Sequence, residues 1–447
     1  IPQIEAPAVT GWNIGTIADY FGLPTGVPGI SVSSLPFRAY ALICNEWFRA
    51  EALSDPLNIP VDDATITGSN GSTFVTDVVK GGAPYTAAKY ADYFTSCLPA
   101  PQRGPEVTIP LTDDGNFPVV PLVGSGSNAL TAGGWNIGDS VKVAYTATGN
   151  IFTTTGLLGN DASGNLNKNV YSGSPEGGAV FQNLWAINDG QLVGASINSL
   201  RMAFQIQKLY EKDARGGGRY IEILKSHFGV TSPDARLQRP EYLGGNRIPL
   251  TINQVIQQSA TDDVSPQGTT TAMSLTTDSH HDFKRSFTEH GIVMGLMVVR
   301  YDHTYQQGIE RFWSRKDRFD YYWPVLANIG EQAVLEKEIY ATGVQADDDA
   351  VFGYQEAWAD YRYKPSRVVG EMRSAAAQSL DSWHLADDYA AAPALSDTWI
   401  REDPANVDRV LAVTSSVSNQ FFADIYVQNW STRPMPVYSI PGLIDHH

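Results

Sequence analysis

The residues best suited to a chemical role are basic and aromatic side chains interleaved in residues 311–324, RFWSRKDRFDYYWP. The candidate contact residues in this stretch are Arg311, Arg315, Lys316, Arg318, Trp313 and Trp323. Aromatic rings stack on bases and arginine binds phosphate, so this composition is typical of a surface for single-stranded DNA. The alternative is a core or interface patch whose arginines pair with neighbouring acidic residues. We favour the alternative, because Trp and Phe at this density usually fill a core or an interface.

Catalytic and nucleotide-binding motifs are not apparent. A phosphate-binding loop needs Gly-Lys followed by Ser or Thr, and the sequence contains no such triplet. It also lacks the G-x-S-x-G turn of hydrolases and the H-E-x-x-H pair of zinc proteases. Paired carboxylates for glycoside hydrolysis need not be close in sequence, and nothing singles out a pair. We therefore expect no enzymatic activity and no cofactor.

Histidines are the most plausible metal ligands in the chain. His280, His281, His290 and His303 fall within 24 positions. Zinc requires three or four converging ligands, and adjacent histidines on an extended chain point to opposite faces. The acidic run at residues 347–349 is typical of a solvated loop. We therefore expect these histidines to be structural or exposed, and we predict no metal site.

Composition limits the classes of function. The 447 residues carry a net charge of −17, which argues against a general polyanion-binding surface. Two cysteines, Cys44 and Cys97, are too few for a disulfide framework, and we expect buried free thiols. The longest apolar run, residues 291–299, is too short to span a bilayer. Because the chain opens at Ile1 without Met, we expect that an N-terminal segment precedes it.

Helical spacing of apolar residues is clearest in two places. Residues 34–48 place aromatic and apolar side chains at i, i+3, i+4 and i+7, with Ser34 as the cap. Residues 196–215 form a second helix, which Gly216 to Gly218 end, because glycine enters the left-handed conformation without penalty. Shorter helices are predicted at 13–21 and 85–94.

Strand patterns come from distant parts of the chain. Alternation predicts strands at 220–224 and 421–427, and apolar runs predict strands at 291–300, 335–340 and 407–413. Between residues 102 and 178, Gly, Ser, Thr and Asn dominate, with strand signals at 141–145 and 151–155. Together with 40 Gly and 26 Pro, this pattern favours a mainly β Greek-key or jelly-roll sandwich with large insertions.

Several long stretches resemble one known family. They are LPFRAYALICNEWFRAEALSDP at 35–56, FQIQKLYEKDARGGGRYIEIL at 204–224, FGVTSPDARLQRPEYLGG at 228–245, RFWSRKDRFDYYWPVLANIGEQAV at 311–334 and FGYQEAWADYRYKPSRVVGEMR at 352–373. They are similar to the major capsid protein of gokushoviruses, small tailless single-stranded DNA bacteriophages of the microvirus group (Microviridae). The resemblance covers nearly the whole chain outside 103–185.

The resemblance implies a fold and a division of the chain. The fold is an eight-stranded viral jelly-roll sandwich with large loop insertions and several short helices. Residues 1–102 would form an N-terminal arm and the first part of the jelly roll. Residues 103–185 would form a surface insertion that projects at the threefold axes, and residues 186–447 would complete the jelly roll with long inter-subunit loops.

The resemblance also implies partners and a location. The chain would be a homo-oligomer in an icosahedral shell around single-stranded DNA, within a virion assembled in the bacterial cytoplasm. A small basic DNA-associated virion protein would share the interior, which fits the acidic balance of this chain. The insertion would meet a bacterial surface receptor, and no membrane insertion is expected. Residues 311–318 would then lie at a subunit contact or face the interior.

The competing hypothesis is a β-sandwich protein that binds or cleaves glycans. Surface aromatic residues and loops rich in Gly and Asn would serve that role as well. The two hypotheses differ in assembly, because a capsid subunit forms particles of megadalton mass and a glycan-binding protein stays a monomer with saccharide affinity.

Overall fold

The computed structural model describes residues 1–105, 107–108, 119–121, 142–147, 150–155, 184–186, 197–231, 239–251, 253–256, 258, 263, 267 and 270–433. The chain divides into two compact units. The first contains Ile1–Arg103 and Tyr210–His447, and the second contains Gly104–Leu209. None of the helices in the described ranges is both long enough and apolar enough to cross a membrane.

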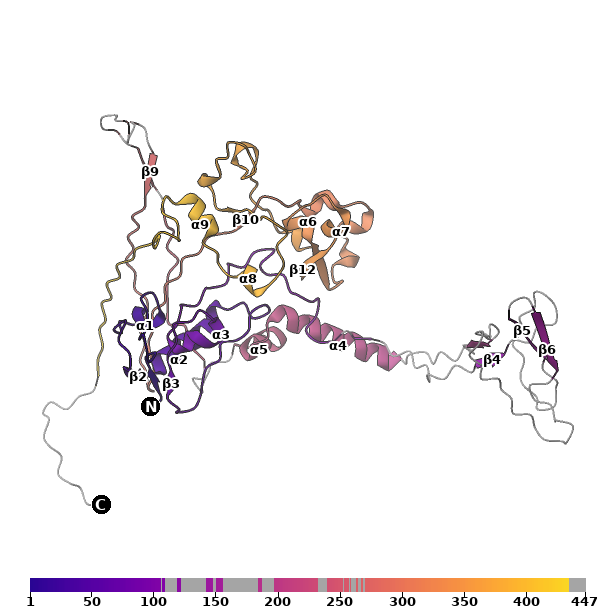
Figure 1. Ribbon diagram of the computed structural model, residues 1–447, viewed down its shortest axis with the longest axis horizontal. Coiled ribbons are helices and arrows are strands. Elements are labelled where there is room, and N and C mark those ends of the chain that lie inside the picture. The colour runs from indigo at the N-terminus through magenta and orange to yellow at the C-terminus, as the bar shows by residue number, and fades with distance from the viewer. Residues whose placement is uncertain are drawn as a thin grey trace, which may run out of the picture. The chain divides into compact units, whose positions relative to one another are not determined.

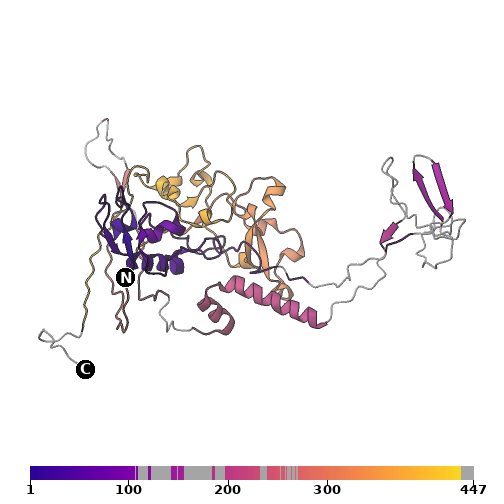
Figure 2. The same ribbon diagram turned by 60° about the horizontal axis from the view of Figure 1, so that its bottom comes forward.

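A small sheet and two helices build the first hydrophobic core (Figures 1 and 2). Strand β1 (Gln3–Glu5) lies between β2 (Ser31–Ser33), which is antiparallel to it, and β3 (Ile66–Thr67), which is parallel. Helix α1 (Ile17–Tyr20) and helix α2 (Leu35–Ile43) pack with this sheet around the fully buried Trp12 and Phe37. Helix α3 (Phe74–Asp77) and a 3-10 turn at Val78–Lys80 complete this core.

The predicted helix at 34–48 is confirmed. Phe37, Ala41 and Cys44 recur at helical spacing and are buried, and α2 continues as a π-helical turn at Cys44–Phe48. Ser34 occupies the N-cap position, but its hydroxyl makes no capping hydrogen bond. Cys44 and Cys97 are free and buried, as expected, and burial raises the pKa of the Cys44 thiol to about 12.

A second core forms from residues far apart in the sequence. Strand β10 (Thr304–Tyr305) runs parallel to β13 (Ala386–Asp387), and β11 (Glu331–Leu335) runs antiparallel to β12 (Val351–Glu356). Short helices α6 (Glu336–Ile339), α7 (Gln345–Asp348), α8 (Asp397–Ile400) and α9 (Ala405–Val410) connect or follow these strands. Phe94, Ile339, Phe352 and Ile400 are among its buried residues.

Residues 87–89 link the two cores. The Ala88 N–H donates to the Phe48 carbonyl at 2.9 Å, and the Lys89 N–H donates to the Ile400 carbonyl at 2.8 Å. These bonds to other segments occupy the backbone where a helix was predicted at 85–94, so that prediction was wrong. Farther along, the Asp92 carboxylate accepts from the Phe94 and Thr95 N–H groups and fixes a turn instead.

The predicted helix at 196–215 is confirmed as α4 (Ile197–Gly216). Gly217 follows it with a φ of +90°, which only glycine adopts without strain. The predicted strand at 220–224 was wrong, because α5 (Tyr220–Phe228) begins there. Its alternating side chains also match helical spacing, and Glu222 accepts from the Arg219 N–H at 3.1 Å to start the helix.

Two other predicted strands were also wrong. Leu335 ends β11, but residues 336–339 form α6, where Glu338 accepts from the Leu335 N–H at 3.1 Å, and residues 407–410 belong to α9. The helix expected at 13–21 is present but is confined to α1, which Thr16 caps through its hydroxyl. Short apolar runs fit either secondary structure, so the pattern alone does not decide between them.

The two strand patterns found within residues 102–178, which are rich in Gly, Ser, Thr and Asn, form a pair of strands. Strand β5 (Lys142–Ala147) pairs antiparallel with β6 (Asn150–Thr155), so the strands predicted at 141–145 and 151–155 are confirmed. Strand β4 (Val119–Pro121) pairs with β7 (Leu184–Ala186). In the first unit, β8 (Asn253–Ile256) pairs with β9 (Thr270–Met273).

The predicted strands at 291–300 and 421–427 are not assigned as strands, although both segments are fully described. Figure 1 shows residues 411–433, which follow α9, mostly as a long ribbon without strand arrows. Apolar side chains stand exposed in both segments, including Met297 at 64% and Phe422 at 96%. The described sheets contain two or three strands each, so the structure shows small sheets with short helices, and the eight-stranded sandwich stays a prediction.

A prediction concerns the backbone of the first core. Gly11 and Gly15 both have positive φ values, of +65° and +82°. A Cβ atom at Gly11 would lie 2.4 Å from the Val27 nitrogen, whereas one at Gly15 would meet nothing within 4 Å. Gly15→Ala should therefore cost about 1–2 kcal/mol of unfolding free energy from its left-handed backbone alone. Gly11→Ala should cost roughly 1–3 kcal/mol more, because the backbone must move.

Denaturant unfolding of the two variants measures this difference. Equal unfolding free energies for Gly11→Ala and Gly15→Ala would contradict the close approach of Gly11 to Val27.

Candidate functional site

Residues 311–326 form three consecutive 3-10 turns, at Arg311–Ser314, Arg318–Asp320 and Pro324–Leu326. These turns leave a set of apolar side chains exposed, which we call the aromatic surface. It consists of Phe312, Trp313, Phe319, Tyr321, Tyr322, Trp323 and Val325. Trp313 is 70% exposed and Val325 is 92% exposed. Large apolar side chains gathered at this exposure are typical of a binding surface.

Short-range hydrogen bonds hold the turns in place. The Asp317 carboxylate accepts from the Phe319 N–H at 2.6 Å and caps the second turn. The Asp320 carboxylate accepts from the N–H groups of Lys316 and Asp317, and these bonds lower the pKa of Asp320. The Trp323 indole N–H donates to the Arg318 carbonyl at 2.7 Å. The sequence therefore folds this loop locally, with the rings presented on a fixed backbone.

Arg315 anchors the loop to the second core. Its Nη2 lies 2.5 Å from Asp360 Oδ2, and the two side chains are only 8% and 10% exposed. The guanidinium also lies over the ring of Tyr361, 4.2 Å from its centre, and 5.2 Å from that of Tyr321. The buried ion pair and the neighbouring rings fix the position of Arg315. Its guanidinium is therefore already bound within the chain.

Arg311 is engaged in the same way. It donates to the Ala333 carbonyl at 2.7 Å and to Glu338 Oε1 at 3.1 Å. Glu338 is buried and also accepts from the Tyr93 hydroxyl at 3.0 Å. Burial raises the pKa of Glu338, and Arg311 opposes that shift. Arg311 therefore balances a carboxylate that would otherwise be unpaired in the core.

Lys316 and Arg318 are exposed and form no ion pair with any part of the chain that the structure describes. Arg318 lies over the Phe319 ring, 4.8 Å from its centre. Of the six residues predicted from sequence, two arginines are therefore internal, and the exposed ones are Lys316, Arg318, Trp313 and Trp323.

The charge of this region is nearly balanced. Residues 310–325 contain four basic and three acidic side chains. Among the acidic ones, Glu310 pairs with Arg367. Phosphate binding depends on unpaired cations, and only two remain beside seven exposed apolar side chains. The arrangement is therefore better suited to burying apolar area against another protein surface than to neutralising a nucleic acid.

Histidines do not form a metal site within the described residues, where no group of three or more His, Cys, Asp or Glu side chains is placed to hold an ion. His280 instead contacts Asp278 and Asp282 at the surface. His303 lies in a buried group of charges that the sequence did not suggest, because its partners are at positions 89, 387 and 402.

Comparisons with known proteins identify the family. Residues 1–443 match the family described as capsid protein (F protein). The chain belongs to this family. Capsid protein VP1 of Spiroplasma virus 4 is 45% identical over 453 residues, covering 99% of this chain and 79% of that protein. The VP1 capsid proteins of Chlamydia phage 1 and Bdellovibrio phage phiMH2K are 40% and 39% identical, covering 99% of this chain and 80% and 78% of theirs.

The resemblance to gokushovirus capsid proteins is thereby confirmed, and this capsid protein has a structural function in a multimeric viral shell. The matches give no support to the glycan-binding alternative. For a capsid protein, exposed apolar side chains in a single chain have an obvious use, since each subunit must be covered by its neighbours.

A prediction follows from the buried ion pair at the base of the aromatic surface. Arg315→Met should lower the unfolding free energy by about 3–5 kcal/mol, because Asp360 would remain buried without its cation. The control Arg318→Met, at an exposed and unpaired site, should stay within about 0.5 kcal/mol of the original protein. Denaturant unfolding monitored by tryptophan fluorescence measures both. A similar small effect for the two variants would show that Arg315 is not structural.

Proposed function

We propose that the aromatic surface of this capsid protein is a contact between neighbouring subunits in the assembled shell. One observation carries the proposal: the rings of the aromatic surface are exposed, while the two arginines that support them are paired inside the chain. Arg311 and Arg315 hold the turns on the second core, and the rings point outward from that support. Such a preorganised apolar surface loses little conformational entropy when it binds.

The energetic scale is adequate for assembly. A buried Trp or Phe covers about 150–250 Å², and apolar burial contributes about 25 cal/mol per Å². Covering Trp313, Phe319 and Trp323 alone would therefore supply several kcal/mol, before the entropic cost of association. Trp and Tyr are also the residues on which interface energy concentrates.

A platform for single-stranded DNA is the second candidate function of the aromatic surface. The exposure of Lys316 and Arg318, without ion pairs in the described part of the chain, is the observation in its favour. Stacking of bases on Trp313 and Phe319 would then replace contact with a neighbouring subunit.

The fold that we propose for the assembled subunit is the eight-stranded viral jelly roll, with residues 291–300 and 421–427 among its strands. Both segments carry strand-like apolar patterns and expose them in the single chain. Extended backbone with unpaired N–H and C=O groups gains hydrogen bonds when it joins a sheet. Pairing would bury these side chains at the same time.

We further propose the remaining roles that the family resemblance implies. The shell would be icosahedral, assembled in the bacterial cytoplasm around single-stranded DNA, without catalysis. Residues 103–185 would project from the shell toward a receptor, between the jelly-roll segments 1–102 and 186–447. The net charge of −17 supports a separate basic protein on the genome, since this chain would not neutralise the DNA by itself.

A substitution in the aromatic surface tests the subunit contact. Trp313→Ser should abolish particles while the subunit stays folded, because the 70% exposed ring makes no core contribution. Val61→Ser is the matched control, with an apolar side chain that is 96% exposed outside the aromatic surface. Light scattering gives the particle mass and circular dichroism checks folding. Particles of normal mass and yield from Trp313→Ser would contradict the proposal.

Charge reversal separates the two candidate functions. In the double variant Lys316→Glu and Arg318→Glu, a subunit contact predicts failure of shell assembly, because like charges would be buried beside Asp317 and Asp320. A DNA platform predicts shells that form normally but contain less DNA. Light scattering with the ratio of absorbance at 260 and 280 nm distinguishes a loss of shells from a loss of DNA.

A further inference from the structure

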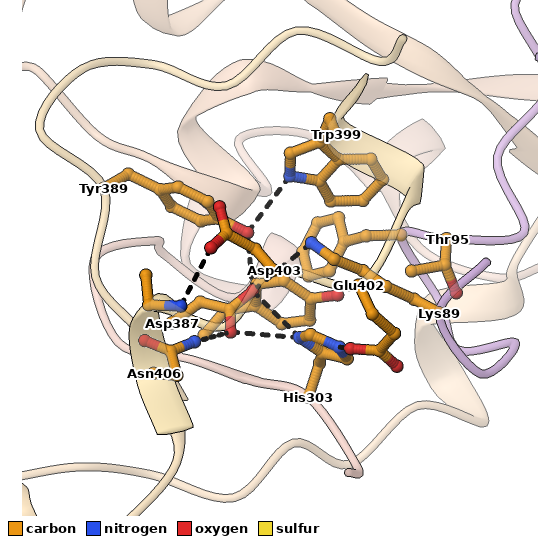
Figure 3. Close-up of polar contacts among 12 residues, drawn as sticks. Lys89, Thr95, His303, Asp387, Tyr389, Trp399, Glu402, Asp403 and Asn406 are labelled. Carbon is orange, nitrogen blue, oxygen red and sulfur yellow. Dashed lines mark hydrogen bonds and ion pairs between the residues drawn. The ribbon is translucent and has the colours of Figure 1, made fainter. Parts of the chain in front are cut away.

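Four charged side chains from distant parts of the chain meet inside the second core (Figure 3). Lys89 Nζ lies 3.8 Å from Asp387 Oδ2, and His303 Nδ1 lies 3.0 Å from Asp387 Oδ1. On its other side, His303 Nε2 lies 3.1 Å from Glu402 Oε2. The His303 side chain is 1% exposed and that of Asp387 is 4% exposed. We call these four side chains the buried charge network.

The geometry determines the protonation state of His303. An ionised carboxylate can only accept hydrogen bonds, so each ring nitrogen that faces one must carry a proton. Both nitrogens of His303 face carboxylates, and the ring is therefore an imidazolium. With Lys89 it supplies two positive charges, which balance the two negative charges of Asp387 and Glu402.

Loss of one proton would break this balance. A neutral His303 would turn an unprotonated nitrogen toward Asp387 or Glu402, so that two acceptors would face each other out of contact with water. The network would also carry one uncompensated negative charge. Both changes are costly in a buried site, where neither solvent nor a spare cation can compensate.

In the part of the chain that the structure describes, no further cation pairs with Asp387 or Glu402, and the nearby Arg409 is bonded to Asn406 and to the Ala386 carbonyl. The Tyr301 ring lies 4.1 Å from the His303 ring, and Asp387 also accepts from the Tyr389 hydroxyl at 2.7 Å and the Asn406 amide at 2.5 Å. Burial raises the pKa values of Tyr301 and Tyr389, so both stay neutral. Asp92 and Asp403 add negative charge near Lys89, whose amine lies 4.5 Å from the centre of the Trp399 ring.

The network joins four segments, which are residues 87–92, residues 301–305, β13 and residues 401–406, and Figure 3 shows Lys89, His303, Asp387 and Glu402 converging. Other hydrogen bonds connect the same segments: the Glu402 N–H donates to the Ala87 carbonyl at 3.0 Å, and the Tyr305 hydroxyl donates to Asp92 at 2.7 Å. Strands β10 and β13 share only two register pairs, Thr304 with Ala386 and Tyr305 with Asp387. A two-residue parallel pairing is weak, so the His303–Asp387 ion pair beside it adds to what holds β10 and β13 together.

We propose that His303 is a protonation-dependent latch, which holds these four segments together while its ring is charged and releases them when the ring becomes neutral. The function is distinct from subunit contact through the aromatic surface. It makes the second core of the capsid protein responsive to alkaline pH.

The direction of the pH dependence follows from the shifted equilibrium. Burial lowers the pKa of His303, but the hydrogen bonds to Asp387 and Glu402 outweigh it and raise the pKa above its ordinary value of 6.5. A raised pKa in the folded state contributes stability that is complete below the unfolded value of 6.5. This stability is lost as the pH rises through the raised folded value. The latch therefore opens on the alkaline side.

Hydrogen exchange of the full-length chain in assembled particles, followed by mass spectrometry from pH 6 to pH 9, tests the latch. After correction for intrinsic exchange rates, peptides covering 87–92, 301–306, 385–389 and 401–406 should lose protection together. Their opening constant should rise about tenfold per pH unit between the ordinary and the raised pKa of His303, then level off. Protection that stays constant with pH in these segments would overturn the proposal.

Three variants assign the effect to His303. His303→Gln should exchange faster at pH 6 and should show no pH dependence in the four segments. Lys89→Arg should keep the original profile, because a guanidinium does not titrate in this range. His280→Gln is the matched control, since His280 also faces two carboxylates but is exposed, and it should keep the original profile.

Two outcomes contradict the assignment. An unchanged pH profile in His303→Gln would exclude His303, and a flat profile in Lys89→Arg would place the titration on Lys89. If His303→Gln fails to fold, nitrogen-15 NMR of the histidine rings in the His280→Gln chain decides the question, because the pKa of His280 is also raised. The latch predicts an imidazolium signal that persists above pH 7 in this variant, and a neutral ring for every remaining histidine at pH 7 would overturn it.

Discussion

Buried carboxylates are the constraint on which the second core depends. Glu338, Asp360 and Asp387 lie out of water, and each is paired with a cation from a distant part of the sequence: Arg311, Arg315 and Lys89. An unpaired buried charge would cost more than the short strands of this core can offset, so the pairs determine which segments come together. The same requirement keeps two arginines of residues 311–318 inside the chain and leaves the rings of that stretch outside.

The sequence predicts local structure well where a long periodic pattern and a clear stop coincide. The helices at 34–48 and 196–215 meet both conditions, and both are present as α2 and α4. It fails at 220–224, 335–340 and 407–413, where a short apolar run fits a strand or a helix. At the first two sites, a glutamate in the first helical turn accepts from the backbone at the start of the helix. The buried charge network could not be predicted, because the spacing of Lys89, His303, Asp387 and Glu402 carries no local signal.

The sequence predicted six candidate contact residues from their residue types, and the structure divides them into internal and exposed side chains. Composition identified residues 311–324 as basic and aromatic, but it could not show which cations were already engaged. Burial and ion pairing assign Arg311 and Arg315 to the core and leave Trp313, Trp323, Lys316 and Arg318 exposed. The family match supports our proposal that a neighbouring subunit covers these side chains, since the subunits of a shell bury surface against one another.

The most direct measurement of the central claim is a reconstruction of the assembled particle at a resolution that shows side chains. The account predicts that Trp313, Phe319 and Trp323 are covered by a neighbouring subunit, with Arg315 still paired to Asp360 beneath them. Rings that face solvent on the outer surface, or that contact density for nucleic acid in the interior, would contradict it.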